Sequence, residues 1–557
     1  MIICPGCGAD MKFDPEKQKL ICQYCDKELD PREYHAPKAA EASEEEGYYT
    51  ATIFTCPQCG AEILSTEETV ATFCSYCGTS VILEGRASEQ EKPNMVIPFR
   101  IGKKDAETSY RRLVKQSLFA PNDLKTDSVI EKFRGIYMPY WVYAMETDEE
   151  FKVRGTTEVR NGDYIEKSTY EIKSPVKATF EGISFDASSG FADNLSDAIA
   201  PFRPKDHAVD FDPAYLSGFY ADAGDLSPDV YRDDAKEVAV DNIASQIQKQ
   251  FNYSKYSVNR NDLKKALHYT DSSKSALFPV WFMSVRNKKG DRISYAVVNG
   301  ETGKAAAEIP IDFKKYLLGA LLIAVPLFIL LNLFLTPTPF KMLLASTVLA
   351  LMSYIISNRQ LDKVYAREMF LDDKGKKAAG KVPVDKKWQK AAEQARMPEK
   401  SNKTLIIVLK ILTQIGLWIL MFAVFMMLAG LIASLLDVDI SSLFAASILG
   451  GYILVTVVIT RKVGNWFNRK AGIQKKETGV KAKSGYNSKY LFKQVIAVGI
   501  AALMLLFRPT DDYYYYIAAG IAFLLIVWSF YDIIHQQNLL TSRKLPHLNA
   551  RGGDENA

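Results

Sequence analysis

Residues 4–25 read CPGCGADMKFDPEKQKLICQYC, and residues 56–77 read CPQCGAEILSTEETVATFCSYC. In each stretch two Cys-x2-Cys turns, here called knuckles, are separated by fourteen residues, and the chain has no cysteine outside them. One knuckle presents two thiolates to a common point, and the second knuckle completes a tetrahedron around a zinc ion. The predicted ligands are Cys4, Cys7, Cys22 and Cys25 for one Zn²⁺, and Cys56, Cys59, Cys74 and Cys77 for another.

The two stretches share more than their cysteines. Both begin Cys-Pro-x-Cys-Gly-Ala, and both second knuckles read Cys-x-Tyr-Cys. This repeat predicts two tandem Cys4 zinc ribbons, small β structures whose all-thiolate sites are structural and leave no coordination position for a catalytic water. A disulfide framework is the alternative interpretation. It is disfavoured because the topology inferred below places these thiols in a reducing cytoplasm.

The predicted ribbons cover residues 1–34 and 53–85, and an acidic linker, residues 35–52, joins them. Residues 1–95 hold 8 Lys and Arg against 17 Asp and Glu, a net charge of −9. Nucleic-acid binding requires basic residues that face phosphate groups. We therefore expect the ribbons to contact protein and do not expect a nucleic-acid partner.

Residues 96–312 are predicted to form a separate soluble α+β domain with antiparallel β-hairpins. The Asn299-Gly300 dipeptide is a strong hairpin signal. Pro139-x-Trp141 and Pro279-x-Trp281 each open a hairpin-like unit, which indicates either a weak internal duplication or a coincidence between two proline-bearing edge strands.

No catalytic constellation emerges from these residues. The five histidines are isolated in sequence. The stretch Gly300-Glu-Thr-Gly303-Lys304-Ala305 lacks the first glycine and the Ser/Thr of a phosphate-binding loop and fits a hairpin turn better. We predict that the protein is not an enzyme.

Long apolar runs follow residue 315. They predict an all-α polytopic membrane domain, residues 316–536, with about six helices and a tail, residues 537–557. Buried helices of a soluble protein are the alternative, but such helices would show a polar stripe at period 3.6. The expected spans are 316–335, 342–356, 411–436, 443–460, 491–507 and 513–534.

Tight connections between these runs alternate with long basic ones. Segment 357–403 carries 13 Lys and Arg against 7 Asp and Glu, and segment 461–490 carries 9 against 1. The positive-inside rule places the long connections and both termini in the cytoplasm, and the chain start lacks a signal-peptide pattern. We expect a multi-pass protein of the cytoplasmic membrane, surrounded by lipid. No ionisable side chain lies at mid-depth in an expected span, which favours an anchor over a conduit.

The ribbons, with Cys4-Pro-Gly-Cys-Gly and Cys56-Pro-Gln-Cys-Gly, resemble TFIIB-type zinc ribbons. The whole layout adds Ile97-Pro-Phe99, Val298-Asn-Gly-Glu-Thr-Gly303 and a multi-pass region, and it resembles a bacterial family of zinc-ribbon membrane proteins. That resemblance implies cytoplasmic partners of the phage-shock (PspA-like) type or the SPFH, virion-core-like type, and a role in envelope stress.

These observations together predict a non-enzymatic integral membrane scaffold whose cytoplasmic zinc ribbons recruit partner proteins. Two other classes stay open. A membrane-tethered nucleic-acid-binding protein is disfavoured by the acidity of residues 1–95. A transporter or channel is favoured by the number of spans and disfavoured by their lack of polar residues.

Overall fold

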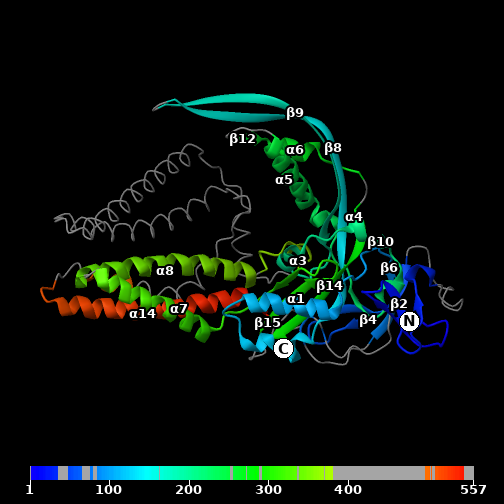
Figure 1. The fold of residues 1–557 in the computed structure, drawn as a ribbon, viewed down its shortest axis with the longest axis horizontal. Coiled ribbons are helices and arrows are strands. Elements are labelled where there is room, and N and C mark those ends of the chain that lie inside the picture. The colour runs from blue at the N-terminus through cyan, green and yellow to red at the C-terminus, as the bar shows by residue number, and fades with distance from the viewer. Residues whose placement is uncertain are drawn as a thin grey trace, which may run out of the picture. The chain divides into compact units, whose positions relative to one another are not determined.

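The structure is a computed structural model (Figure 1). The chain folds into two compact units. The sheet unit comprises Met1–Pro310, Asp372–Lys381 and Thr541–Ala557, and the helical unit comprises Ile311–Leu371 and Val382–Leu540. The residues that the structure describes are 2–34, 48–65, 74, 76–78, 85–161, 164–250, 255–270, 273–287, 292–334, 338–368, 370–380, 493, 496–501, 503–504 and 509–544.

Ribbon 1 is a three-stranded antiparallel sheet of β1 (Met11–Asp14), β2 (Lys19–Cys22) and β3 (Glu28–Leu29). Its small core faces the rest of the sheet unit. The rings of Phe13 and Tyr215 make an edge contact with centroids 5.4 Å apart. The Ser217 hydroxyl donates to the Met11 carbonyl at 2.5 Å, and the Phe13 N–H donates to the Ser217 carbonyl at 3.1 Å. Ribbon 1 is thus packed against the sheet unit.

Ribbon 2 is part of the large sheet. Its strands β4 (Tyr48–Thr55), β5 (Glu62–Ser65) and β6 (Gly85–Glu91) form one end of a 14-stranded sheet. β5 pairs antiparallel with β11 (Tyr220–Asp222), and β11 pairs parallel with β8 (Arg134–Asn161). The sequence suggested a ribbon over 53–85 that is separate from the domain over 96–312. Instead, hydrogen bonds between strands merge the two, and the predicted linker supplies the start of β4.

The centre of this mixed sheet contains the two Pro-x-Trp segments. They lie in β8 and in β14 (Lys274–Arg286), which pair antiparallel with Pro139 opposite Leu277 and Pro279 opposite Tyr137. Each proline carbonyl accepts a backbone N–H at 2.8 Å, from Ala187 and from Gly300 respectively. Each tryptophan Nε1 donates to a backbone carbonyl at 2.8 Å. This matched bonding supports an internal duplication, and the strands are central rather than edge strands.

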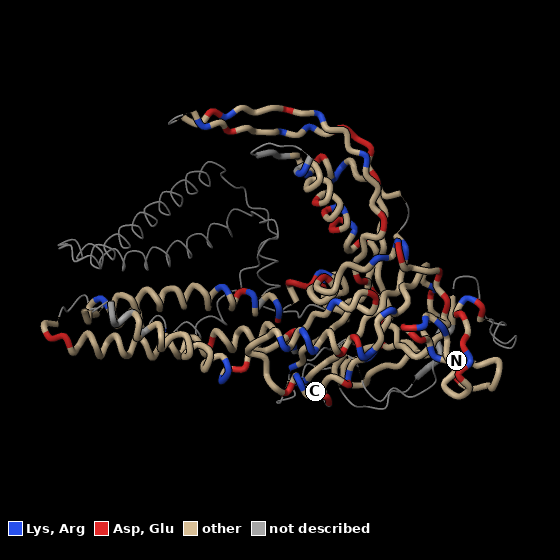
Figure 2. Tube along the Cα trace, in the orientation of Figure 1, with Lys and Arg blue, Asp and Glu red and all other residues tan. Residues whose placement is uncertain are grey.

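Each half of the duplication continues as a hairpin. β8 pairs with β9 (Tyr164–Asp186), and β14 pairs with β15 (Arg292–Asn299). The β8–β9 hairpin runs beyond the other strands as a long arm (Figure 1). α5 (Arg232–Gln250) and α6 (Arg260–Ala266) bury an apolar face against it, and β12 (Lys255–Val258) pairs with β8. Acidic and basic residues intersperse along the outer part of the arm (Figure 2).

The remaining elements of the sheet unit are short, apart from α1. The turn at Asn299-Gly300 joins β15 to β16, as the dipeptide predicted, with Gly303 at φ +76°. These remaining elements are η1 (Pro31–Glu33), β7 (Met95–Val96), α1 (Lys103–Gln116), η3 (Asn122–Lys125), α2 (Asp127–Ile130), α3 (Asp193–Ile199), α4 (Pro204–His207), β10 (Val209–Asp210), η4 (Pro213–Leu216), η5 (Pro228–Val230), β13 (His268–Tyr269), β16 (Ala305–Ala307), α9 (Lys374–Ala378) and β17 (Arg543–Lys544).

The helical unit contains α7 (Phe313–Phe334), α8 (Pro339–Glu368) and α14 (Asp512–Leu540). Among the residues described, α8 and α14 are two helices long and apolar enough to cross a membrane, by length and composition. The charged residues of α7 and α8 gather toward the helix ends (Figure 2). An all-α membrane domain of six helices is therefore not supported by this part of the chain. The expected spans 411–436 and 443–460, and much of 491–507, lie outside the described residues.

α8 and α14 pack against each other through small and polar side chains. The hydroxyls of Ser353 and Ser529 are 2.7 Å apart, and Gln536 Nε2 donates to Ser357 Oγ at 3.1 Å. Hydrogen bonds of this kind hold membrane helices together. Lys493 forms a 2.6 Å ion pair with Asp532 of α14.

Candidate metal centres

The structure brings together the sulfur atoms of each predicted ligand set. In both sets all four lie within 4.8 Å of one another. The distances from Cys4 to Cys25 and from Cys7 to Cys22 are 3.6 and 3.5 Å between sulfur atoms. The corresponding distances in ribbon 2 are 3.7 and 3.8 Å. A tetrahedron with Zn–S bonds of about 2.3 Å has edges of about 3.8 Å, so both sets fit a zinc ion.

Backbone geometry at the knuckles explains the choice of residues. Gly8 and Gly60 follow the first knuckle of each ribbon with φ of +77° and +72°, where a side chain would be strained. Gly6 N–H donates to Cys4 Sγ at 3.4 Å and lowers the pKa of this thiol to about 6. The N–H group of Cys25, and to a smaller extent that of Tyr24, lowers the pKa of the Cys22 thiol. These contacts favour the thiolate forms of Cys4 and Cys22, and a metal ion requires thiolate ligands.

The two centres differ in exposure. Within ribbon 1, Cys4 and Cys22 are buried, whereas Cys7 and Cys25 are exposed. All four ligands of ribbon 2 are buried, in a core shared with the central strands of the sheet. The same motif therefore gives one centre that is open on one side and one that is enclosed.

The knuckle tyrosines show how this difference arises. Tyr76 of ribbon 2 is 2% exposed and lies in an apolar socket that includes Phe282, whose ring centroid is 5.7 Å away. Its hydroxyl points to the sulfur of Met138 at 3.8 Å, and the Tyr295 hydroxyl donates to its carbonyl at 2.8 Å. A Cβ at Gly190 would lie 3.3 Å from its ring, so glycine permits this close approach. Burial raises the pKa of Tyr76 well above its ordinary value.

Tyr24 occupies the matching position in ribbon 1 and is 83% exposed. The neighbouring backbone also differs between the copies. Arg286 Nε donates to the Cys77 carbonyl at 2.5 Å, which ties the second knuckle of ribbon 2 to β14. The second knuckle of ribbon 1 therefore presents to solvent the surface that ribbon 2 buries.

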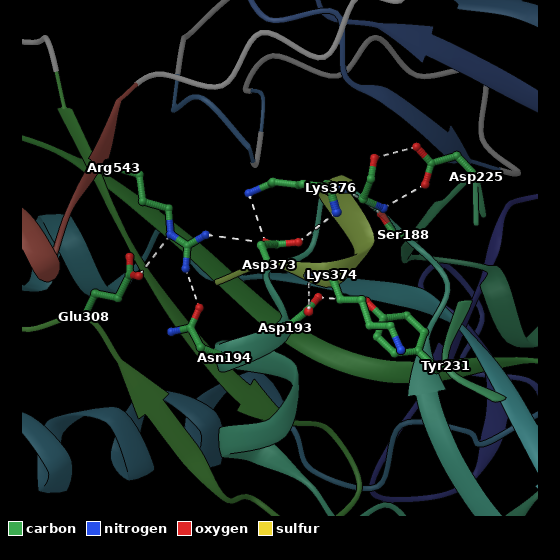
Figure 3. Close-up of polar contacts among 12 residues, drawn as sticks. Ser188, Asp193, Asn194, Asp225, Tyr231, Glu308, Asp373, Lys374, Lys376 and Arg543 are labelled. Atoms are coloured by element: carbon green, nitrogen blue, oxygen red, sulfur yellow. Dashed lines mark hydrogen bonds and ion pairs between the residues drawn. The ribbon is translucent and has the colours of Figure 1, made fainter. Parts of the chain in front are cut away.

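A second polar centre of the sheet unit joins residues far apart in the sequence (Figure 3). Arg543 of β17 is buried and donates to Glu308 at 3.1 Å and also to Asn194. It lies 4.0 Å from Asp373, which caps α9 by accepting the Lys376 N–H at 2.8 Å. Burial raises the pKa of the Asp373 carboxyl, and the charge of Asp193 acts in the same direction. The cations of Lys376 and Arg543 lower this pKa, but the net effect is a raised value.

The segment after α8 is fixed by further bonds in the same place (Figure 3). Asp193 accepts the Lys374 N–H at 2.7 Å and the Tyr231 hydroxyl at 2.8 Å. A Cβ at Gly375 would lie 2.9 Å from both Leu226 and Tyr231, so the segment fits tightly. Sequence reasoning missed this centre, because Asp373 and Lys374 lie in the basic segment 357–403, whose composition indicates only a cytoplasmic connection between spans.

The described histidines and carboxylates do not form a third ligand set. His207 Nδ1 lies 2.6 Å from Glu301, the acid of the Gly300–Gly303 turn. Asp212 caps η4 by accepting the Ala214 N–H. Among the described residues, the two cysteine sets are the groups of three or more possible metal ligands that come together.

Comparison with known proteins finds similarity to a protein of Bacillus subtilis. No family model matches the chain, and no solved structure matches it. The chain is 31% identical over 322 residues to the "Uncharacterized protein YdjG" of Bacillus subtilis (strain 168). The match covers 56% of this chain and 90% of the relative.

Proposed function

Because the chain belongs to the same family as YdjG of Bacillus subtilis, whose name states no activity, we propose a function from the geometry. The protein is a non-enzymatic membrane scaffold, and the second knuckle of zinc ribbon 1, Cys22–Cys25, docks a cytoplasmic protein. The observation that carries this proposal is the contrast between buried Tyr76 and exposed Tyr24.

Ribbon 2 provides the template for the docking mode. Its tyrosine fills a socket of apolar and aromatic side chains, and hydrogen bonds fix the knuckle backbone beside it. Tyrosine has an apolar ring and a polar hydroxyl group, and it is enriched among the residues that dominate the binding energy of protein interfaces. A partner with a similar apolar socket, rimmed by hydrogen-bonding groups, would bind Tyr24 in the same way.

The membrane anchor supports the second part of the proposal. α8 and α14 satisfy the length and composition of a span. The chain segments that directly follow them, residues 372–380 and 541–544, belong to the sheet unit. We therefore propose that the C-terminal ends of α8 and α14 face the same side of the membrane as the sheet unit. This favours an even number of spans, and our proposal has six. Basic connections place that side in the cytoplasm.

The class of partner follows from the resemblance described above. Tandem ribbons joined to a multi-pass anchor are similar to proteins that act with PspA-like or SPFH-like partners. We include recruitment of such a protein during envelope stress in the proposal. The net charge of −9 over residues 1–95 weighs against nucleic acid as the partner.

The test compares two exposed tyrosines of the sheet unit. Tagged full-length protein is isolated from native membranes as wild type, as Tyr24→Ala and as Tyr164→Ala. Tyr164 lies at the outer end of β9 and is 81% exposed, so it is a matched control. We expect partner recovery to fall at least about tenfold for Tyr24→Ala, as for loss of an interface hot spot. Equal recovery from both variants would remove the basis of the proposal.

A further inference from the structure

We propose that the ribbon 1 centre is a redox-responsive metal site. Peroxides oxidise its cysteines and release its metal ion, whereas the ribbon 2 centre retains its own. This inference goes beyond the proposed function, because the chemistry requires no partner protein. It starts from the different exposure of two centres that share one motif.

Access to sulfur differs between the two centres. Oxidation of a cysteine follows its thiolate character and its exposure. Cys7 and Cys25 are exposed, and no described atom lies within 4 Å of where a Cβ on Gly8 would be. In ribbon 2, a Cβ on Gly78 would meet Ser284 and Arg286 of β14 at 3.3 and 3.6 Å. A peroxide can therefore reach ribbon 1 directly, whereas ribbon 2 must first separate from the sheet.

The positions of the sulfur atoms pair an exposed thiolate with a buried one. The Cys25 thiolate attacks one peroxide oxygen, the O–O bond breaks, and a sulfenic acid and a hydroxide form. The Cys4 thiolate, 3.6 Å away, attacks that sulfur, forms a disulfide and expels a second hydroxide. Two electrons pass from two thiolates to one peroxide, and two protons from solvent convert the hydroxides to water. Cys7 and Cys22, 3.5 Å apart, can react in the same way.

Only two thiolates of the set would then remain to hold a metal ion, and a disulfide is a poor ligand, so ribbon 1 would lose its ion. The effect stays local, because β1, β2 and β3 form a sheet of their own, whereas the strands of ribbon 2 belong to the large sheet. Tyr24 lies between Cys22 and Cys25, so oxidation also reshapes the docking knuckle. This last consequence rests on the proposed function, and the metal chemistry does not.

The test uses purified full-length protein loaded with two Zn²⁺, treated with hydrogen peroxide in the presence of a chromogenic zinc chelator. We expect one equivalent of zinc to appear at least about tenfold faster than the second, because local opening limits the enclosed site. Peptide mapping by mass spectrometry after thiol alkylation should find the first disulfide among Cys4, Cys7, Cys22 and Cys25.

Two variants make the assignment specific. Cys25→Ser should abolish the fast phase and leave the slow one. Tyr164→Ala, at an exposed tyrosine of β9 outside both ribbons, should leave both phases unchanged. The assay contains no partner protein, so failure of partner docking and failure of metal release are distinguishable. Release of both equivalents at one rate, first oxidation within residues 56–77, or absence of release would each overturn the inference.

Discussion

Asp186 closes β9 as a buried carboxyl group whose Oδ2 has no hydrogen-bond partner among the described residues. Burial raises its pKa well above the ordinary value, and the charges of Asp193, Asp373 and Asp197 act in the same direction. The folded protein therefore holds a proton that the unfolded chain releases near pH 4. Stability falls as pH rises from the unfolded pKa toward the folded pKa, because the unfolded state binds fewer protons there.

Asp186→Asn should consequently stabilise the sheet unit at pH 7.5, since asparagine resembles the neutral acid. We expect the thermal midpoint in detergent to rise by about 2–4 °C per kcal/mol of ionisation cost removed, with no rise at pH 4. The exposed Asp148→Asn serves as the control and should change the midpoint little at either pH. A loss of stability at pH 7.5, or the same gain at both pH values, would show that Asp186 is not held neutral.

The buried position of Arg543 also makes its contribution to stability testable. This arginine is buried among Glu308, Asp373 and Asn194, and Arg543→Ala would remove the buried cation that both carboxylates contact. We expect a loss of about 3–5 kcal/mol in the free energy of unfolding, measured by urea denaturation followed by tryptophan fluorescence. The control, Lys177→Ala, breaks an exposed pair with Asp148 and should change the free energy of unfolding little. Similar losses would mean that the Arg543 cluster does not stabilise the sheet unit.

At the scale of elements, the two ribbons share one motif but differ in how they join the fold. Ribbon 1 keeps its own sheet and contributes a packed face, whereas ribbon 2 supplies three strands to the large sheet. Its cysteines belong to the same apolar core as Met138, Phe278 and Val297. Cys4 and Cys22 of ribbon 1 also pack in an apolar core, with Tyr137 and Trp281, but β1, β2 and β3 pair with one another and not with the described strands of the large sheet. Metal loss should therefore disturb mainly ribbon 1 itself in the first ribbon and the large sheet in the second.

Metal analysis of matched serine variants checks this difference. The wild type should hold about two zinc ions per chain, one for each ligand set. Cys25→Ser should retain about one zinc ion and nearly the whole thermal midpoint. Cys77→Ser, at the same position of the motif, should lower the midpoint strongly, because its centre lies in the sheet core. The prediction fails if the two variants lose stability equally, or if the wild type contains iron.

The sequence could predict features that depend on local spacing, and it could not predict those that depend on distant pairing. Two Cys-x2-Cys pairs specify a ligand set, and Asn299-Gly300 specifies a turn, because a few neighbouring residues decide each one. The socket of Tyr76 involves Tyr295, 219 residues away, and Arg543 meets Asn194 across 349 residues. No short-range pattern indicates such contacts. The two Pro-x-Trp segments could be recognised in the sequence because each is a local pattern. Their central position in the sheet could not be predicted, because it depends on pairing between distant strands.

At the scale of the whole molecule, the chain enters the helical unit after Pro310 and returns to the sheet unit after α8 and again after α14. Each return is fastened: the first by Asp193 and α9, the second by the pairing of β17 with β15. Both returning segments are thus hydrogen-bonded within the sheet unit. The arrangement is consistent with an anchor that holds the ribbons on one side of the membrane.

This topology predicts opposite labelling at the two ends of α8. A cysteine at the exposed Thr338, before the first turns of α8, should react with a membrane-impermeant maleimide in intact cells. A cysteine at the exposed Lys377, in α9, should react only after permeabilisation. The natural cysteines are kept, because replacing those of ribbon 2 would disturb the sheet. Labelling of Lys377→Cys in intact cells would place the sheet unit outside the cell.

The central claim is that the second knuckle of ribbon 1 contacts a partner protein, and site-specific photo-cross-linking at that position tests it most directly. A photoreactive amino acid replaces Tyr24 in one strain and Tyr164 in another, and living cells are irradiated. We expect a discrete protein adduct at position 24 that is absent at position 164 and disappears when zinc is withheld during growth. No adduct at position 24, or the same adduct at both positions, would contradict it.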